Sequence, residues 1–268
     1  MASLAKCLTH GLLASCLAVL AQPAHAQGHA TPHLRDAGTE PVSLPKAESS
    51  APITPDKFNL YLDRLEAAEA VKRLIASFSY YRSSNLPEHT VALFAADGSV
   101  DYAGGKWIGH RSLRRLFEGR FRQTALHGTT GPQPGVLSAS YSMQPVIDVG
   151  PHARTAAARF REVEYWGQHS QEQTYGARLY EAVFTKNADG VWTIQSLTPC
   201  QAWKTDYGAD LSTAPMPEYP AAAPALYPEA SDGPDRLSSQ VCVPWPFGGI
   251  TPPMHYPHPV TGEFINKP

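Results

Sequence analysis

The sequence lacks several features that would place the protein in common functional classes. Its 268 residues contain no run of basic side chains, and the net charge is −2, so nothing in the composition favours a nucleic-acid partner. Neither a phosphate-binding loop nor a dinucleotide-binding glycine motif occurs, and the G-x-S-x-G nucleophile motif is missing too. Charged residues make up 17% of the chain and hydrophobic residues 43%, which is typical of a globular protein with a sizeable core.

The histidines do not form a recognisable metal-binding motif. His255 and His258 flank Tyr256-Pro257, but a metal site would need a third ligand at a defined spacing. Neither an H-E-x-x-H motif nor a neighbouring carboxylate supplies that ligand. We therefore expect no metal and no cofactor.

Long hydrophobic runs are also missing, and the longest, Leu12–Leu20, is too short to span a bilayer. Lys6 precedes this run and Ala24–Ala26 follows it, which is the order found in an export signal with an A-x-A cleavage site. A lipobox at Leu13–Cys16 is the alternative. We predict a signal peptide over residues 1–26, no membrane span, and a periplasmic or secreted mature protein.

Cysteine is scarce, with four residues in the chain. Cys7 and Cys16 lie in the predicted signal. Cys200 and Cys242 remain as an even pair in an oxidising compartment, which favours a disulfide that would pin the C-terminal tail to the last strand of the core. Two separate free thiols are the alternative.

Proline, in contrast, is abundant, and the 25 prolines gather near the two ends of the chain. Residues 27–53 are rich in Pro, Ser, Ala and His without periodicity, which predicts a flexible lead-in. Residues 207–268 are too aromatic for a disordered tail and too rich in proline for a helix. We expect them to form an extended arm that packs over the core or over a neighbouring subunit, next to a domain at 54–206.

The first part of that domain has helical periodicity. Thr54-Pro55 predicts a helix start, because a capping hydroxyl precedes a proline in the first turn. Apolar residues from Leu65 to Tyr81 recur every three or four positions, and Ser83–Asn85 ends the helix. We predict, after it, a short helix from Pro87, a strand over Ser99–Tyr102 after a helix end at 95–98, and a third helix from His110 to about Arg122.

The periodicity changes to two after Gly135. Alternating segments cover 136–149, 155–166, 173–186 and 191–198, and Asn187–Gly190 predicts a hairpin turn. Helices followed by antiparallel strands indicate an α+β fold, with a curved antiparallel sheet and three N-terminal helices packed on one face.

Three sequence segments in this order resemble a known family. They are LFAADGSVDY at 93–102, the W-x-G-x-R/H-x-x-L segment at 107–113, and DGVWTI at 189–194, all after a first helix that ends at Tyr80-Tyr81. The chain resembles the SnoaL-like branch of the nuclear transport factor 2 superfamily over about residues 60–203. This resemblance implies a cone-shaped α+β fold around a deep apolar pocket, and usually no cofactor. The superfamily includes scytalone dehydratase, ketosteroid isomerase and lignin-dimer γ-formaldehyde lyases, as well as binding domains without catalytic activity.

The resemblance also implies catalytic candidates. Tyr102 occupies a position at which scytalone-dehydratase-like enzymes carry a tyrosine, and strand alternation places it on the same face as Val100. Tyr81 falls on the apolar stripe of the first helix, although the acidic partner that the family keeps there is replaced. His127 lies where related enzymes carry a general-base histidine, and an imidazole can transfer a proton near neutral pH without a metal.

Further side chains are candidates for contact with the substrate. They are Tyr80, Trp107, Arg161, Tyr165, Tyr175, His255 and Tyr256. An inward arginine could hold a phenolate or carboxylate, and a tail that covers the pocket could deliver His255 or Tyr256.

Together with these residues, the resemblance implies a cofactor-independent lyase that acts on a bulky aromatic alcohol in a pocket lined by aromatic side chains. Loss of formaldehyde from the hydroxymethyl group of a lignin-derived dimer, a diaryl diol or phenylcoumaran, is the leading hypothesis. The alternatives are a dehydratase of a polycyclic or aromatic alcohol, and a non-catalytic periplasmic binder of hydrophobic small molecules. An isomerase would need a carboxylate base, and alternation turns Asp101 away from the Tyr102 face. A homodimer or homotrimer through the open sheet face is expected.

Overall fold

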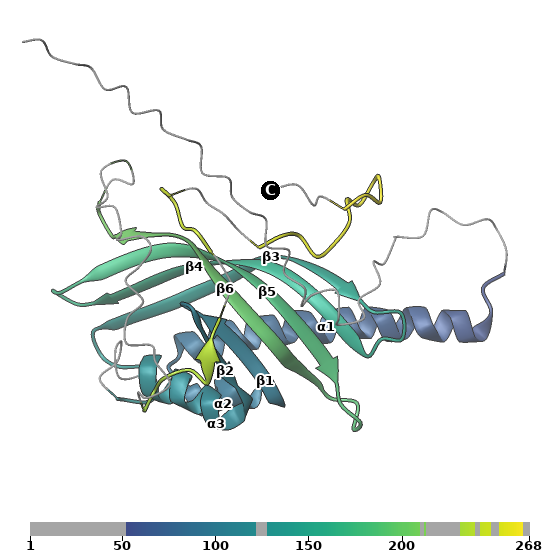
Figure 1. The fold of residues 1–268 in the computed structure, drawn as a ribbon, viewed down its shortest axis with the longest axis horizontal. Coiled ribbons are helices and arrows are strands. Elements are labelled where there is room, and N and C mark those ends of the chain that lie inside the picture. The colour runs from purple at the N-terminus through teal and green to yellow at the C-terminus, as the bar shows by residue number, and fades with distance from the viewer. Residues whose placement is uncertain are drawn as a thin grey trace, which may run out of the picture. The chain divides into compact units, whose positions relative to one another are not determined.

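The computed structural model describes residues 52–121, 128–209, 212, 231–238, 242–247 and 252–264, all within one compact unit at 31–268. The predicted signal peptide and nearly all of the lead-in lie outside the described residues. Within them the fold is α+β, with the helices N-terminal to a curved, unclosed sheet (Figure 1). The elements are α1 Pro55–Ser83, α2 Pro87–Ala92, β1 Phe94–Tyr102, β2 Gly105–Ile108, α3 Gly109–Arg114, the π-helix η1 Arg115–Phe121, β3 Val136–Val149, β4 Thr155–Gln168, β5 Gln173–Lys186, β6 Trp192–Asp206 and β7 Arg236–Leu237.

Helix α1 begins as its sequence predicts. The Thr54 hydroxyl accepts a hydrogen bond from the Lys57 amide at 3.3 Å, and a proline opens the first turn. The C-terminal half of the helix buries Val71, Ile75 and Phe78 in the core. Leu65, which the periodicity also placed inward, is 66% exposed. The apolar stripe is therefore longer than the part of the helix that contacts the core.

The segment after α2 differs from the prediction. Strand β1 begins at Phe94, so residues 95–98 belong to the strand, where the register with β6 shifts, and not to a helix end. Strand β2 pairs antiparallel with β1, and it was not predicted. Ala103 and Gly104 connect the two strands with positive φ angles of 47° and 83°, which a two-residue hairpin requires. Four residues are too few for a period of two to be recognised in the sequence.

The seven strands have the order β3-β4-β5-β6-β1-β2-β7. Strands β3 to β6 pair antiparallel, and the Asn187–Gly190 turn joins β5 to β6 as predicted, with the Asn187 amide donating to the Val191 carbonyl at 2.9 Å. The predicted curved α+β sheet is confirmed, and it is mixed, because β1 runs parallel to β6. Strand β1 enters the sheet from the helices rather than from a hairpin, so its direction is not fixed by a turn.

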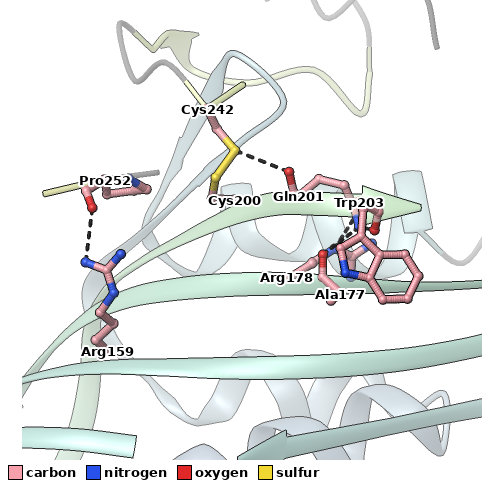
Figure 2. The surroundings of a disulfide bond; sticks show 8 residues. All are labelled: Arg159, Ala177, Arg178, Cys200, Gln201, Trp203, Cys242 and Pro252. Carbon is pink, nitrogen blue, oxygen red and sulfur yellow. Dashed lines mark hydrogen bonds between the residues drawn. A yellow bond between two sulfur atoms is a disulfide. The ribbon is translucent and has the colours of Figure 1, made fainter. Parts of the chain in front are cut away.

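The two faces of the sheet have different coverings. Even-numbered residues of β4, such as Phe160 and Glu162, face α1, and odd-numbered residues face away from the helices. On that second face, segments of the C-terminal arm are attached by the Cys200–Cys242 disulfide (Figure 2). The predicted disulfide is confirmed, and it joins the arm to β6 as expected. Arg159 adds a second attachment, because its guanidinium donates to the Pro252 carbonyl at 3.0 Å.

No helix within the described ranges combines the length and the apolar character needed to cross a bilayer.

Candidate active site

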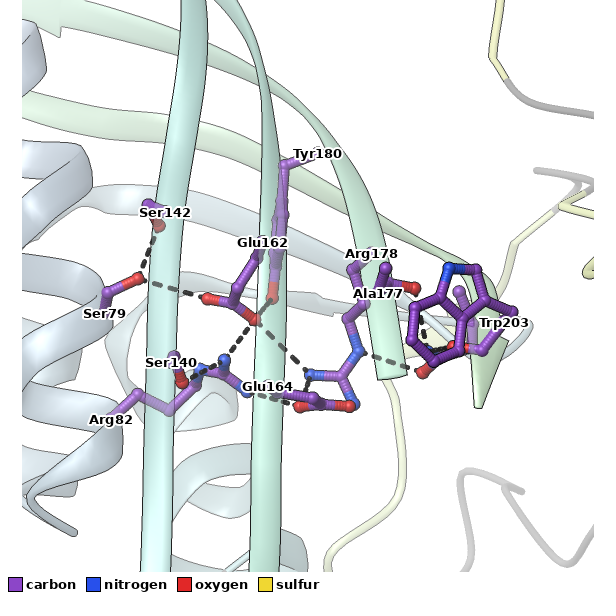
Figure 3. Close-up of polar contacts among 11 residues, drawn as sticks. Ser79, Arg82, Ser140, Ser142, Glu162, Glu164, Ala177, Arg178, Tyr180 and Trp203 are labelled. Atoms are coloured by element: carbon purple, nitrogen blue, oxygen red, sulfur yellow. Dashed lines mark hydrogen bonds and ion pairs between the residues drawn. The ribbon is translucent and has the colours of Figure 1, made fainter. Parts of the chain in front are cut away.

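A buried polar cluster lies between α1 and the helix-facing side of the sheet (Figure 3). At its centre is Glu162 of β4, whose side chain has no access to solvent. Its carboxylate accepts hydrogen bonds from the Tyr180 hydroxyl at 3.0 Å and from the Ser79 hydroxyl at 3.1 Å, and it forms an ion pair with Arg82. One helix and two strands therefore meet at a single carboxylate.

A second carboxylate and a second guanidinium complete the cluster. Arg178 of β5 forms an ion pair with Glu164 at 2.6 Å and lies 3.8 Å from Glu162. Arg82 lies 3.6 Å from Glu164 and donates to the Ser140 hydroxyl at 2.9 Å. Two cations thus face two carboxylates, and the charges of the cluster balance.

The surroundings of Arg82, Arg178 and Tyr180 keep these three side chains protonated. Burial alone would lower the pKa of Arg82, but Tyr180, Glu162 and Glu164 outweigh burial and raise it. The pKa of Arg178 is raised in the same way, chiefly by Tyr180 and Glu164. Burial raises the pKa of Tyr180, so its phenol keeps the proton that it donates to Glu162.

The local sequence explains how these side chains come together. Ser79 and Arg82 follow Ile75 and Phe78 on the same side of α1, at helical spacings of three and four. On β4 and β5, alternation carries the polar side chains onto the face that Phe160 and Tyr180 share, and these two rings stack at 4.7 Å. Alternation along the sequence puts Glu162 and Glu164 on one face of the strand, but it does not say which face meets the helices.

Tyr102 lies on the helix-facing side together with the buried Val100, as alternation predicted. Its ring is half-buried and packs edge-to-face on Phe121 at 5.0 Å. Asp101 points the other way and pairs with Lys106 at 3.1 Å.

The other candidates from the helical region are dispersed. Tyr81 is half-buried, with its ring 5.6 Å from that of His89, whereas Tyr80 is 74% exposed. Trp107 is completely buried in the core, where its indole N–H donates to the Asp232 carbonyl at 3.3 Å. His127 lies outside the described residues, and its role stays a prediction.

Three candidates lie on the opposite face of the sheet from the buried cluster. Arg161 and Tyr165 are odd-numbered residues of β4, and Tyr175 of β5 stacks against Tyr165 at 6.2 Å. The structure does not bring these side chains to Tyr102. Alternation places Arg161 and Tyr165 on one face of β4, and this face points away from the helices.

His255 and Tyr256 lie on the arm, with their rings 5.2 Å apart. The imidazole of His255 is held between Glu181 at 2.9 Å and Asp148 at 3.1 Å, on the outer side of the sheet. Burial would lower its pKa, but the hydrogen bonds to Asp148 and Glu181 outweigh burial and raise the pKa to about 9. His255 therefore attaches the arm as a cation.

A cavity of about 190 Å³ lies where α1 ends against β3. It is lined by Ser83, Ser84, Asn85, Gly131, Pro132, Gln133, Val136 and Ser138. Ser138 belongs to the same face of β3 as Ser140, so the cavity lies on the helix-facing side of the sheet, next to the cluster. In the described part of the chain, no group of three or more His, Cys, Asp or Glu side chains has the geometry of a metal site.

Helices packed on a curved sheet, with a buried polar cluster between them, define an α+β domain of the nuclear transport factor 2 type. The chain belongs to the SnoaL-like domain family, whose model matches residues 63–198. The predicted resemblance is confirmed. No curated protein matches the chain significantly.

Several solved structures are similar to the chain. A scytalone dehydratase-like protein of Novosphingobium aromaticivorans DSM 12444 has 19% identity and a TM-score of 0.46, covering 56% of this chain and 93% of that chain. The hexachlorocyclohexane dehydrochlorinase LinA-type3 of Novosphingobium barchaimii LL02 has 15% identity and a TM-score of 0.44, covering 59% and 99%. A LinA structure has 13% identity and a TM-score of 0.48, with the same two coverages. These likenesses concern the fold.

Proposed function

We propose that the protein is a cofactor-independent lyase that acts on an aromatic alcohol on the helix-facing side of its sheet. The observation that carries the proposal is the position of Tyr102, a half-buried phenol on the helix-facing side of the sheet, which is also the side of the Glu162 cluster. A partly buried phenol can hydrogen-bond an oxygen that gains charge as a bond breaks. The activities of the similar structures belong to those proteins, and the proposal does not depend on them.

In this mechanism His127 acts as the base, as the sequence predicts, and Tyr102 supports the leaving oxygen. In a dehydration, the base removes a proton from carbon, the C–H electron pair forms the double bond, and the hydroxyl leaves as water with a proton from the phenol. In the second mode, the base removes the proton of a terminal hydroxymethyl group. Formaldehyde then leaves as the C–C bond breaks, and the electrons expel the benzylic oxygen, which is protonated by the phenol.

The more specific proposal is that the protein releases formaldehyde from a lignin-derived diaryl diol or phenylcoumaran. It is supported by the aromatic side chains of the sequence and by the expected export of the protein. Purified protein would be incubated with a panel of such compounds and of simpler aromatic alcohols without added cofactor. Mass spectrometry would follow formaldehyde and water-loss products. Binding without turnover of any compound would favour the non-catalytic alternative.

Replacement of Tyr102 by phenylalanine tests the role of its hydroxyl. Because this change keeps the ring that packs on Phe121, we expect the fold to persist and the turnover rate to fall about 10²- to 10⁴-fold. Tyr141→Phe is the matched control, since Tyr141 is exposed on the opposite face of the sheet. A Tyr102→Phe variant with the unchanged rate would overturn the proposed site.

A further inference from the structure

Residues 231–238 belong to the C-terminal arm, but they pack into the domain rather than onto the outer face of the sheet. This segment contacts α3 and η1 and contains strand β7, the yellow-green arrow beside β2 in Figure 1. It lies outside residues 63–198, which the family model matches. Gly233 and Pro234 at its centre are buried. A part of the arm is therefore built into the helix-containing side of the molecule.

Pro234 fills a space beside Tyr102. Gly105 is the register partner of Tyr102 across β1 and β2, so side chains at these two positions project to the same face. A Cβ atom on Gly105 would lie 2.8 Å from both Cβ and Cγ of Pro234. The proline ring therefore occupies the place of a side chain at position 105, next to Tyr102, and the glycine permits this close approach.

The same segment holds η1 near both of its ends. At the first residue of η1, the Arg115 guanidinium donates to the Asp235 carboxylate at 2.7 Å and to the Gly233 carbonyl at 3.3 Å. Near the last residue, Arg120 pairs with Asp232 at 3.4 Å. Helices of the π type are rare, and they occur frequently at functional sites. Contacts from the arm thus fix the position of this helix.

Phe121 connects the position of η1 to that of Tyr102. It is the last residue of η1, and its ring packs edge-to-face on the Tyr102 ring at 5.0 Å. Phe117 of the same helix packs on Phe121 at 5.6 Å and on Phe94 at 6.0 Å. Such aromatic pairs have preferred geometries. A displacement of η1 would therefore move the ring against which the phenol packs.

We propose that residues 232–235 of the arm position Tyr102 for the proposed reaction. Pro234 limits the space on one side of the phenol, and the contacts of Asp232 and Asp235 with η1 hold Phe121 against its ring. This inference rests on the proposed function, because it assigns positioning residues to the same site. These residues act through Tyr102. A displacement of a reacting group by about 1 Å can lower a rate by about 100-fold.

The test is Arg115→Gln, which removes two contacts with the segment and leaves every aromatic ring in place. We expect kcat to fall about 10- to 100-fold with little change in KM, because the phenol supports an oxygen that gains charge only as the bond breaks. The matched control is Arg114→Gln, since Arg114 is 56% exposed and pairs with Glu118 at 3.8 Å. Its kcat should equal that of the wild type.

A second readout needs no turnover. In protein labelled with fluorotyrosine, the fluorine NMR signal of Tyr102 is the one that the Tyr102→Phe variant lacks. We expect Arg115→Gln and Pro234→Ala to shift this signal and to leave that of Tyr141, which is exposed on the outer face, unchanged. A general loss of structure would alter both signals.

An unchanged Tyr102 signal in both variants would overturn the proposal, and so would a wild-type kcat in Arg115→Gln. Should Arg115→Gln fail to fold, Pro234→Ala carries both measurements. A shifted signal in a protein that turns over no panel compound would retain the contact between the arm and Tyr102 and reject the lyase. Turnover that depends on Tyr102 but not on Arg115 or Pro234 would retain the lyase and reject the positioning role.

Discussion

Glu162 has no access to solvent, and its carboxylate is held by donors from α1 and β5. Without its charge, Arg82 and Arg178 would share Glu164 alone. Removal of one partner from a buried ion pair destabilises a protein by about 3–5 kcal/mol, because the remaining charge stays buried. We expect Glu162→Gln to lower the free energy of unfolding by an amount of that order, measured by urea denaturation.

Two neighbouring changes at the residue scale serve as controls. Glu164 is 15% exposed, so water can partly replace its contacts, and Glu164→Gln should destabilise less. Tyr180→Phe keeps the stacking on Phe160 and removes a single hydrogen bond, which costs about 1–3 kcal/mol. Equal effects of the Glu162 and Glu164 substitutions would contradict the central place given to Glu162.

At the scale of elements, long periodic segments could be predicted and short ones could not. Helix α1 and strands β3 to β5 begin within a residue of their predicted starts, since each repeats its pattern over many residues. Strands β2 and β7 have four and two residues, and tertiary pairing alone defines them. The cluster around Glu162 was missed for a different reason. Alternation groups side chains by face, but it does not say which face an α-helix covers.

One carboxylate supplies three of the contacts that attach the segment of strand β7. Asp235 accepts from the Ile108 amide at 2.7 Å, the Ser112 hydroxyl at 2.9 Å and Arg115 at 2.7 Å. Burial would raise its pKa, but these three contacts outweigh burial and lower it. We expect Asp235→Asn to weaken the attachment and to speed hydrogen exchange of the Ser238 amide, which donates to the Gly104 carbonyl at 2.8 Å.

Mass spectrometry of peptides covering 231–238 would follow that exchange. The exposed Glu172 provides a control, since Glu172→Gln should leave exchange in this segment unchanged. If Asp235→Asn exchanges at the wild-type rate, the pairing of β2 with β7 must hold the segment without the carboxylate. In that case Asp235 would not be the anchor of β7.

At the scale of the described molecule, two of the attachments of the C-terminal arm to the sheet respond to different solution conditions. The Cys200–Cys242 disulfide joins it covalently to β6, and His255 joins it through Asp148 of β3 and Glu181 of β5. Arg159 of β4 lies 2.8 Å from Glu181 and adds a second cation to this group. A reductant would break the first attachment and leave the second, whereas alkaline pH would act on the second alone.

The pH dependence of the second attachment follows from the raised pKa of His255. Its ordinary pKa is 6.5 and its folded-state pKa is about 9, so its stabilisation is complete below pH 6.5 and is lost as the pH rises through 9. The raised pKa of Glu181, caused mainly by burial, acts in the same direction. The difference between 6.5 and about 9 corresponds to roughly 3 kcal/mol.

Chymotrypsin cleavage of the arm, which carries Phe247 and Tyr256, would measure this effect. We expect reduced protein to be cleaved slowly at pH 6.5 and faster at pH 10, because the His255 attachment is lost once the imidazole is neutral. The hydrogen bonds from Arg159 to the Pro252 carbonyl and from the Trp245 amide to the Ala202 carbonyl then remain. Oxidised protein should show a smaller increase.

His255→Gln should be cleaved rapidly at both pH values when reduced. The control is His258→Gln, which changes a histidine without a carboxylate partner among the described residues and should behave like the wild type. Slow cleavage of reduced protein at pH 10, relative to a peptide substrate at the same pH, would show that packing alone holds the arm and that the His255 contacts are dispensable.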